Sequence, residues 1–198
     1  MVGKSCVDDR KRVAMQGLRS KRWLVALLWC LGSSMSQAQS VYQGQLANGL
    51  KVLVQTDRRA PVVVSQIWYR VGSADEEEVT GVAHALEHMM FKGTMNVGPG
   101  EFSKRIAALG GRENAFTSRD YTAYFQTVAA AALGEALRLE ADRMQHLRLS
   151  ADEFAREIRV IQEERRLRTD DKPHARVSEA LFATGFAGAA YRHPIIGW

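Results

Sequence analysis

The stretch HALEHMMFKGT, residues 84–94, places two histidines and a glutamate on one face of a predicted helix. His84 and His88 are four residues apart, so their rings project from the same side about one turn apart. Glu87 follows His84 by three residues and lies on that side too. Two imidazoles in this arrangement can reach one tetrahedral ion at roughly 2.0–2.1 Å each. The pattern therefore predicts a metal site on a helix.

The same three residues indicate hydrolytic chemistry. A zinc-bound water is acidic enough to act as a nucleophile near neutral pH, and a neighbouring carboxylate can take its proton. The order H-x-x-E-H is that of the inverted zinc metallopeptidases. Glu87 is then the expected general base. The alternative is a helix whose histidines only cap or pack, because a five-residue motif with three fixed positions is common by chance.

A third ligand is expected from the helix that begins near Ser150. Its apolar residues mark a broad sector: Phe154, Ile158, Val160, Ile161 and Leu167. At about 100° per residue, Glu157 and Glu164 fall near the middle of this sector, and Glu163 falls outside it. Two carboxylates directed into a core are costly unless a cation compensates them. The alternative partner is a buried arginine, Arg143 or Arg176.

The charge of the chain does not indicate a polyanionic partner. The formal net charge is +5 and the pI about 9.4. Residues 1–38 contain seven Lys or Arg and two Asp, so they account for all of it. The 20 basic and 20 acidic residues that remain cancel. A basic pI confined to the first 38 residues is no evidence for nucleic-acid binding.

Residues 1–38 have the order of a signal peptide. A basic segment is followed by the apolar run WLVALLWCLG, residues 23–32, and then by small polar residues. Ser36-Gln37-Ala38 fits a cleavage site, so we expect a secreted or periplasmic protein that begins near Gln39 and has no membrane span. An uncleaved anchor is the alternative, although ten apolar residues are too few to cross a bilayer. Both cysteines lie in this leader, so a metal site must use nitrogen and oxygen ligands.

The remaining chain reads as strands first and helices later. Strands are predicted in residues 41–57 around an Asn48-Gly49 turn, in 60–73, and twice within 113–130 around 118–120. Helices are predicted from the acidic residues 74–78 to Gly93, and over 101–111, 133–147, 150–169 and 174–186. Ser150 and Glu153 form a predicted capping box. This order favours an α+β fold with a mostly antiparallel sheet packed against helices.

Several separated blocks together resemble one known family. They are GVAHALEHMMFKGT, NAFTSRDYTAY, ADRM, EIRVIQEERR and YRHPIIGW, in this order. The chain from residue 41 to 198 resembles the pitrilysin family of zinc peptidases, and within it the mitochondrial processing peptidase and its bacterial relatives. The resemblance implies a pitrilysin-type α+β fold, one bound Zn²⁺ and a peptide substrate.

The resemblance also implies a role for each matching position. The zinc ligands would be His84, His88 and a glutamate at position 163 or 164, for which the helical phase favours Glu164. Glu87 would be the catalytic base, and Glu157 would support a ligand from behind. The substrate would lie extended beside the strand that contains three further matching residues: Asn114, Ala115 and Thr117.

The resemblance covers only the first of two homologous halves that such proteins have. Residues 39–198 are therefore expected to form an N-terminal zinc-peptidase domain whose second half is absent. The predicted function is zinc-dependent endopeptidase activity on peptides or short unfolded segments. The alternative is a non-catalytic or half-subunit partner that needs a second chain to complete the active site.

Overall fold

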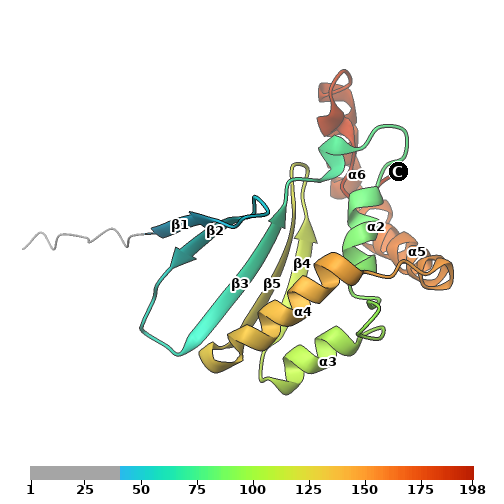
Figure 1. The fold of residues 1–198 in the computed structure, drawn as a ribbon. Helices are drawn as coiled ribbons and strands as arrows, with labels where there is room; N and C mark the ends of the chain where they lie inside the picture. The colour runs from blue at the N-terminus through green and yellow to red at the C-terminus, as the bar shows by residue number, and fades with distance from the viewer. Residues whose placement is uncertain (1–40) are drawn as a thin grey trace, which may run out of the picture. The chain divides into compact units, whose positions relative to one another are not determined.

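The structure, a computed structural model, describes residues 41–198 and divides into two units (Figure 1). The first unit ends at Arg58 and the second is Arg59–Trp198. The predicted signal peptide, residues 1–38, and the expected start at Gln39 lie outside the described residues. None of the helices in residues 41–198 combines the length and the apolar content needed to cross a bilayer.

The first unit contains a β-hairpin. Strand β1 (Val41–Gln45) pairs antiparallel with β2 (Lys51–Gln55). The Asn48 side chain accepts a hydrogen bond from the Leu50 N–H at 3.1 Å, and Gly49 has a φ of +88°. That φ is easily reached by glycine alone, which is why Asn-Gly marks a tight hairpin. The predicted hairpin is confirmed.

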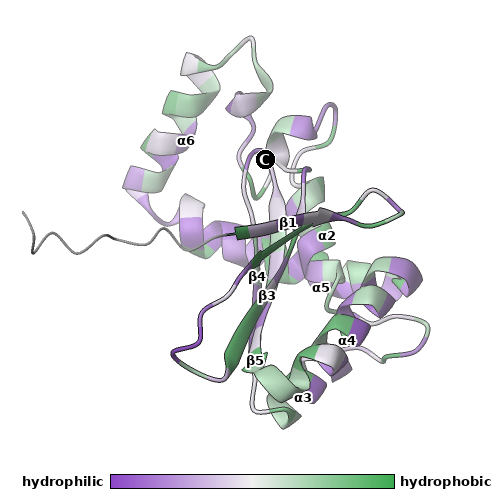
Figure 2. Cartoon of the chain, turned by 60° about the vertical axis from the view of Figure 1, so that its left-hand side comes forward, coloured by the Kyte–Doolittle hydropathy of each residue, from purple (hydrophilic) through white to green (hydrophobic). Residues whose placement is uncertain are grey.

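The second unit is built on an antiparallel sheet in the order β3-β5-β4. Its strands are β3 (Val62–Tyr69), β4 (Arg112–Thr117) and β5 (Thr122–Ala129). Burial alternates along β3 and β4, as expected when only one sheet face is covered. The first residues of β3 are strongly apolar (Figure 2). β4 has a neighbour on one side only, so it is an edge of this sheet.

The helices of the second unit follow the predicted order. They are α2 (Val82–Met89), α3 (Glu101–Ala108), α4 (Leu133–His146), α5 (Ala151–Arg165) and α6 (Pro173–Gly185). Helix α5 continues as a π-helical turn over Arg166–Asp170. Short 3-10 turns occupy Ser73–Asp75, Ala130–Ala132 and Ala190–Arg192. The α+β prediction is confirmed.

One predicted helix start and one predicted capping box differ from the structure. The acidic residues 74–78 are not the first turn of α2, which begins at Val82 after a left-handed Gly81. At the start of α5, the Ser150 hydroxyl accepts the Glu153 N–H at 3.5 Å, which is half of the predicted capping box. The Glu153 carboxylate pairs with Arg156 instead. A nearby guanidinium is the stronger partner for an exposed carboxylate than a backbone N–H.

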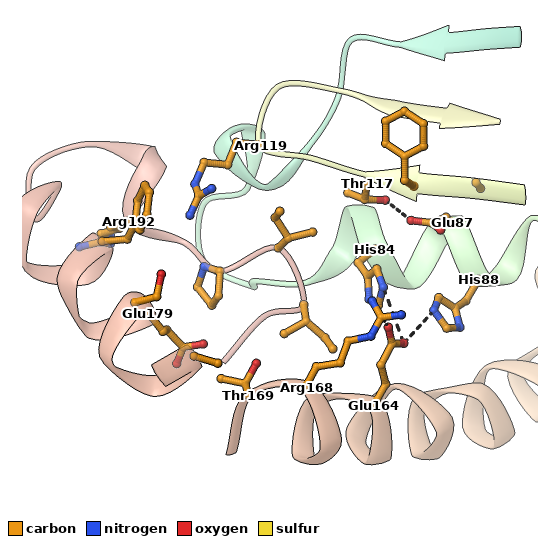
Figure 3. A pocket seen from close by; sticks show the side chains of 18 of the residues that line it. His84, Glu87, His88, Thr117, Arg119, Glu164, Arg168, Thr169, Glu179 and Arg192 are labelled. Carbon is orange, nitrogen blue, oxygen red and sulfur yellow. Dashed lines mark hydrogen bonds and ion pairs between the residues drawn. The ribbon is translucent and has the colours of Figure 1, made fainter. Parts of the chain in front are cut away.

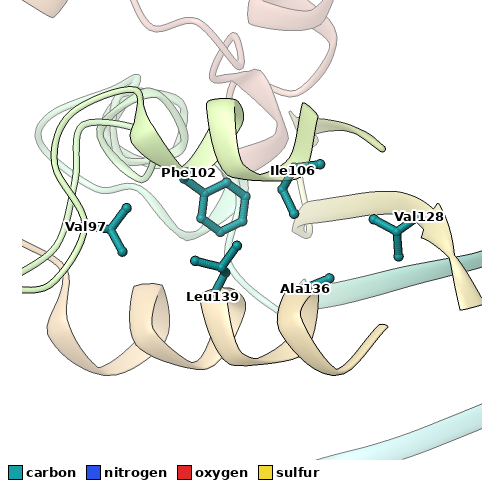
Figure 4. Close-up of a cluster of buried hydrophobic side chains, with 6 residues drawn as sticks. All are labelled: Val97, Phe102, Ile106, Val128, Ala136 and Leu139. Atoms are coloured by element: carbon teal, nitrogen blue, oxygen red, sulfur yellow. The ribbon is translucent and has the colours of Figure 1, made fainter. Parts of the chain in front are cut away.

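Helices α3 and α4 pack on the covered face of the sheet. Six buried side chains form this core: Val97, Phe102, Ile106, Val128, Ala136 and Leu139 (Figure 4). They come from α3, α4, β5 and the loop before α3. Burial of such side chains supplies the main driving force for folding. The sheet is thereby held rigidly on one side.

A buried arginine lies beside this core. Arg143 and Glu140 are both 1 % exposed and form an ion pair at 2.5 Å. The guanidinium lies 4.4 Å from the centre of the Phe102 ring and 4.5 Å from that of Tyr124. Glu140 also accepts a hydrogen bond from Gln126 at 2.8 Å. The ion-pair partner of Arg143 is therefore Glu140 of its own helix, and not a glutamate of α5.

We predict that Leu139→Ala lowers the free energy of unfolding by about 2–5 kcal/mol, because Leu139 is 2 % exposed and its loss leaves a cavity. Denaturant unfolding of the variant measures this. Leu137→Ala is the matched control, since Leu137 is on the same helix and 45 % exposed. Equal destabilisation by the two changes would contradict the assignment of the core.

Candidate metal centre

Helix α2 is held at its N-terminus by a carboxylate from the preceding loop. Glu76 accepts hydrogen bonds from the backbone N–H groups of Gly81 at 2.7 Å and Ala83 at 2.8 Å. These donors have no partner within the helix, and a negative charge there is favoured by the helix dipole. The acidic stretch thus caps α2 from outside. This fixes the direction in which the histidines project.

Three predicted ligand side chains converge between α2 and α5 (Figure 3). Glu164 Oε2 lies 3.3 Å from His88 Nε2 and 3.9 Å from His84 Nε2. One ligand atom from each of the three residues lies within 4.8 Å of the others. The centroids of the His84 and His88 rings are 4.7 Å apart. Two nitrogens and one carboxylate oxygen therefore face a common centre.

The three donors fit a divalent cation. Burial, followed by the neighbouring His88, lowers the pKa of His84, which favours the neutral imidazole that metal binding requires. His84 Nδ1 is buried and lacks a hydrogen-bond partner among the described residues. Arg168 binds the other oxygen of Glu164, Oε1, at 2.8 Å and leaves Oε2 facing the rings. The donor set is typical of zinc sites.

Glu157 supports the ring of His88 from behind. Its Oε1 lies 2.8 Å from His88 Nδ1, and its Oε2 lies 2.5 Å from Lys92 Nζ. A proton on Nδ1 donated to Glu157 leaves Nε2 free as a lone-pair donor. Burial alone would raise the pKa of Glu157, but the hydrogen bonds from Lys92 and His88 outweigh it and lower that pKa. Glu157 is therefore held as a carboxylate.

Glu87 lies on the β4 side of α2. The Thr117 hydroxyl donates a hydrogen bond to Glu87 Oε2 at 2.5 Å. Burial raises the pKa of Glu87, and the Thr117 hydrogen bond lowers it in part. A carboxylate in this state is a better proton acceptor than an exposed glutamate. Thr117 thus positions the side chain that the motif marks as a base.

Helix α5 directs Glu157 and Glu164 inward as the helical phase predicted, although most of the predicted apolar sector around them is not buried. Glu157 is 8 % exposed, and Glu164 is half-buried. Of the predicted apolar sector, only Ile161 is buried and Ile158 half-buried, while three members are exposed: Phe154, Val160 and Leu167. The buried face is thus a narrow stripe that contains two carboxylates. His88 and Lys92 compensate Glu157, while the two histidines and Arg168 face Glu164.

The alternative ligand and the alternative arginine partners lie away from the three donors. Glu163 is on the exposed side of α5, where it pairs with Arg166 at 2.5 Å. Arg143 pairs with Glu140, and Arg176 is an exposed residue of α6. The arginine that does contact Glu164 is Arg168, which sequence reasoning did not consider.

The predicted substrate strand borders the same cleft, which has a volume of about 630 Å³. Its lining includes His84, Glu87, His88, Asn114, Ala115, Phe116, Thr117, Arg119, Glu164 and Arg168. Ser118 at the end of β4 donates its N–H to the Tyr121 carbonyl at 2.7 Å. Alternation along an antiparallel pair then turns the backbone groups of Ala115 and Thr117 away from β5. Accordingly, the Ala115 N–H donates to the neighbouring Asn114 Oδ1, at 2.9 Å.

Several residues of the site had no role in the sequence reasoning. Lys92 follows His88 by four residues within the helix predicted up to Gly93, so its place beside His88 had a usable signal, although α2 ends at Met89. Glu76 carried a weaker signal, because it is one of several acidic residues before α2. Phe116 on β4 and Arg119 in the β4–β5 turn also line the cleft. No spacing rule in the sequence points to them.

Comparison with known proteins gives one family. A family model described as insulinase, peptidase family M16, matches residues 51–197. A zinc protease, PqqE, from Helicobacter pylori is 40 % identical over 178 residues, covering 87 % of this chain and 40 % of that protein. A probable mitochondrial-processing peptidase subunit beta from Arabidopsis thaliana is 33 % identical over 153 residues, covering 77 % of this chain and 29 % of that protein.

Solved structures give the same picture. The crystal structure of a protease from Helicobacter pylori has a TM-score of 0.78 and 38 % identity, covering 81 % of this chain and 39 % of that one. A peptidase M16 inactive domain from Pseudomonas fluorescens has a TM-score of 0.73 at 21 % identity, over 80 % of this chain and 39 % of that one, and shares the fold. The chain thus spans about 40 % of the length of these two structures.

We predict that Glu157→Gln weakens zinc binding about 10- to 100-fold, because a neutral amide accepts the His88 Nδ1–H more weakly than the carboxylate and no longer forms an ion pair with Lys92. Competition with a chromophoric chelator measures the affinity. Glu153→Gln is the matched control, since Glu153 lies on the same helix and pairs only with Arg156. Equal affinities for the two variants would contradict a role for Glu157 behind the ligand.

Proposed function

The chain belongs to the insulinase family of peptidases, peptidase family M16, and we propose that it is the zinc-binding, catalytic half of a metalloendopeptidase. The observation that supports this best is the convergence of His84, His88 and Glu164 beside Glu87 in one cleft. The substrates would be peptides or short unfolded segments. Export to the periplasm or beyond is part of the proposal and rests on the leader sequence alone.

Each side chain has a distinct task in this proposal. His84, His88 and Glu164 would hold zinc, which when bound supplies Lewis-acid activation of the scissile carbonyl and of the attacking water. Glu87 accepts a proton from that water and passes it to the leaving amine. Thr117 keeps the Glu87 carboxylate aimed into the cleft. Glu157 and Lys92 keep His88 in the tautomer that offers Nε2.

We expect Glu87→Gln to retain zinc and to lower peptide cleavage on the order of 10²- to 10⁴-fold, because the amide cannot take up the proton. Zinc content by elemental analysis and cleavage of an unstructured fluorogenic peptide are the two measurements. His84→Ala is the companion variant and should lose the zinc. A Glu87→Gln variant that cleaves at the wild-type rate would refute the catalytic assignment.

A peptide would bind as an added strand beside β4. This edge has no neighbour among the described strands, and the N–H of Ala115 points away from β5. An extended peptide can pair with such an edge through backbone hydrogen bonds. Asn114 would then release the Ala115 N–H that its side chain now covers. The Thr117 end of the strand leads the peptide past Glu87.

Ala115→Pro tests this alignment. Proline on an edge strand is tolerated where the N–H points outward, so the variant should fold and retain zinc. It should lose most of its affinity for a peptide, measured by fluorescence anisotropy in the Glu87→Gln background to prevent cleavage. Ala115→Gly is the control, because it changes the same residue and keeps its backbone N–H. Unchanged peptide affinity in Ala115→Pro would exclude pairing at this position.

The length of the chain supports a second element of the proposal. Because the chain spans about 40 % of the length of two solved structures that it matches, a second half or subunit would close the cleft over the substrate. The alternative, a non-catalytic partner subunit, is less well supported because the donor set is intact. Peptide cleavage by the lone chain would remove this alternative, and size-exclusion chromatography with a candidate partner would detect the complex.

A further inference from the structure

The segment Pro194–Trp198 packs directly on the start of α2. Gly81 and Gly197 both have a φ of +83°. A Cβ on Gly81 would lie 2.7 Å from the Ile196 carbonyl oxygen, and one on Gly197 would lie 2.7 Å from the Thr80 carbonyl oxygen. Neither position accommodates a side chain. The backbone that leads into the histidine helix is thus held against the Ile196-Gly197 backbone.

Arg165 connects α5 to this contact between the backbones at Gly81 and Gly197. It follows Glu164 directly in sequence, and its guanidinium donates to the Gly197 carbonyl oxygen. The same guanidinium grips both carboxylate oxygens of Glu179 on α6, at 2.9 and 3.1 Å. Such two-point contacts fix orientation as well as distance. Arg165 is mostly shielded from solvent, at 22 % exposure.

The C-terminal end of α5 needs these contacts of Arg165 if the Glu164 carboxylate is to stay beside the imidazoles. Among the described residues, Glu157 and Glu164 make all the ion pairs between α5 and residues 82–92. Those of Glu157 are with His88 and Lys92. Glu157 lies seven residues earlier, about 10 Å along the helix. Beyond Arg165 the helix changes to a π-helical turn. A helix anchored only at Glu157 could swing its Glu164 end away from the imidazoles.

We propose that Arg165 is a positioning residue for the metal centre: by holding the Ile196-Gly197 backbone and Glu179, it sets Glu164 at the distance at which it and the two histidines share one cation. The inference rests on the metal site of the proposed function. It adds that the affinity of this site depends on a contact between α5, α6 and the backbone at the start of α2. Arg165 is neither one of the three donors nor part of the cleft lining.

The test is zinc binding by the full chain. Arg165→Ala should weaken zinc binding by about tenfold or more, the usual effect of removing a group that orients ligands. Arg166→Ala is the matched control: Arg166 is the next residue, has ion pairs to Glu163 at 2.5 Å and Asp171 at 2.6 Å, and faces solvent. It should leave the zinc affinity within twofold of wild type.

The spectrum of the cobalt-substituted protein provides a readout that general destabilisation does not move. Removal of Arg165 should change the Co²⁺ ligand-field bands, because Glu164 shifts, while Arg166→Ala leaves them unchanged. A zinc affinity of Arg165→Ala equal to wild type, or an equal loss in Arg166→Ala, would overturn the inference. A wild-type chain that binds no zinc would instead refute the proposed function.

A second variant decides the matter if Arg165→Ala does not fold, as judged by circular dichroism and thermal melting. Glu179→Gln keeps the arginine and its bond to Gly197 but removes the charged fork. It should weaken zinc binding by less than Arg165→Ala is expected to, yet measurably more than Arg166→Ala does. An affinity for zinc equal to that of Arg166→Ala would overturn the proposal.

Discussion

The pairing of two α5 carboxylates with the histidine helix is the interaction on which the rest of the structure depends. Glu157 and Glu164 would each be costly to bury alone, since a charge removed from water must find compensation. The charge of Glu157 is compensated by His88 at 2.8 Å and by Lys92 at 2.5 Å. Glu164 faces two imidazoles and Arg168. The helices therefore approach each other through polar contacts, where most helix pairs use apolar ones.

This constraint explains the division of labour in the second unit. The apolar core lies between the sheet and α3 with α4, around Leu139 and Phe102. Helix α5 contributes little to that core, with Ile161 as its buried apolar residue. One part of the unit is thus packed for stability and the other for chemistry. Strand β4 connects them, because it pairs with β5 and carries Thr117 to Glu87.

The sequence allowed much of this to be predicted, and the failures have physical causes. The Asn48-Gly49 hairpin and the alternating strands follow from local chemistry that tertiary contacts reinforce. Helical phase placed Glu157 and Glu164 on one inward face, although the apolar residues used as the guide are largely exposed: Phe154, Val160 and Leu167. Periodicity reports which residues share a face, but the partner surface decides which face is buried. The contacts of Glu76, Arg165 and Arg168 depend on tertiary geometry, which local spacing does not encode.

The crossing of Gly81 with Gly197 has a consequence for biosynthesis. Thr80 is hydrogen-bonded to a residue 118 positions later, and the contact seats the helix that carries the histidines. Synthesis proceeds from the N-terminus at about 5–20 residues per second. Helix α2 is therefore made well before residues 196–198, which it contacts. At that rate, residues 194–198 follow α2 by several seconds. The helix that carries the two histidines therefore gains this backbone contact only after α3 to α6 have been synthesised.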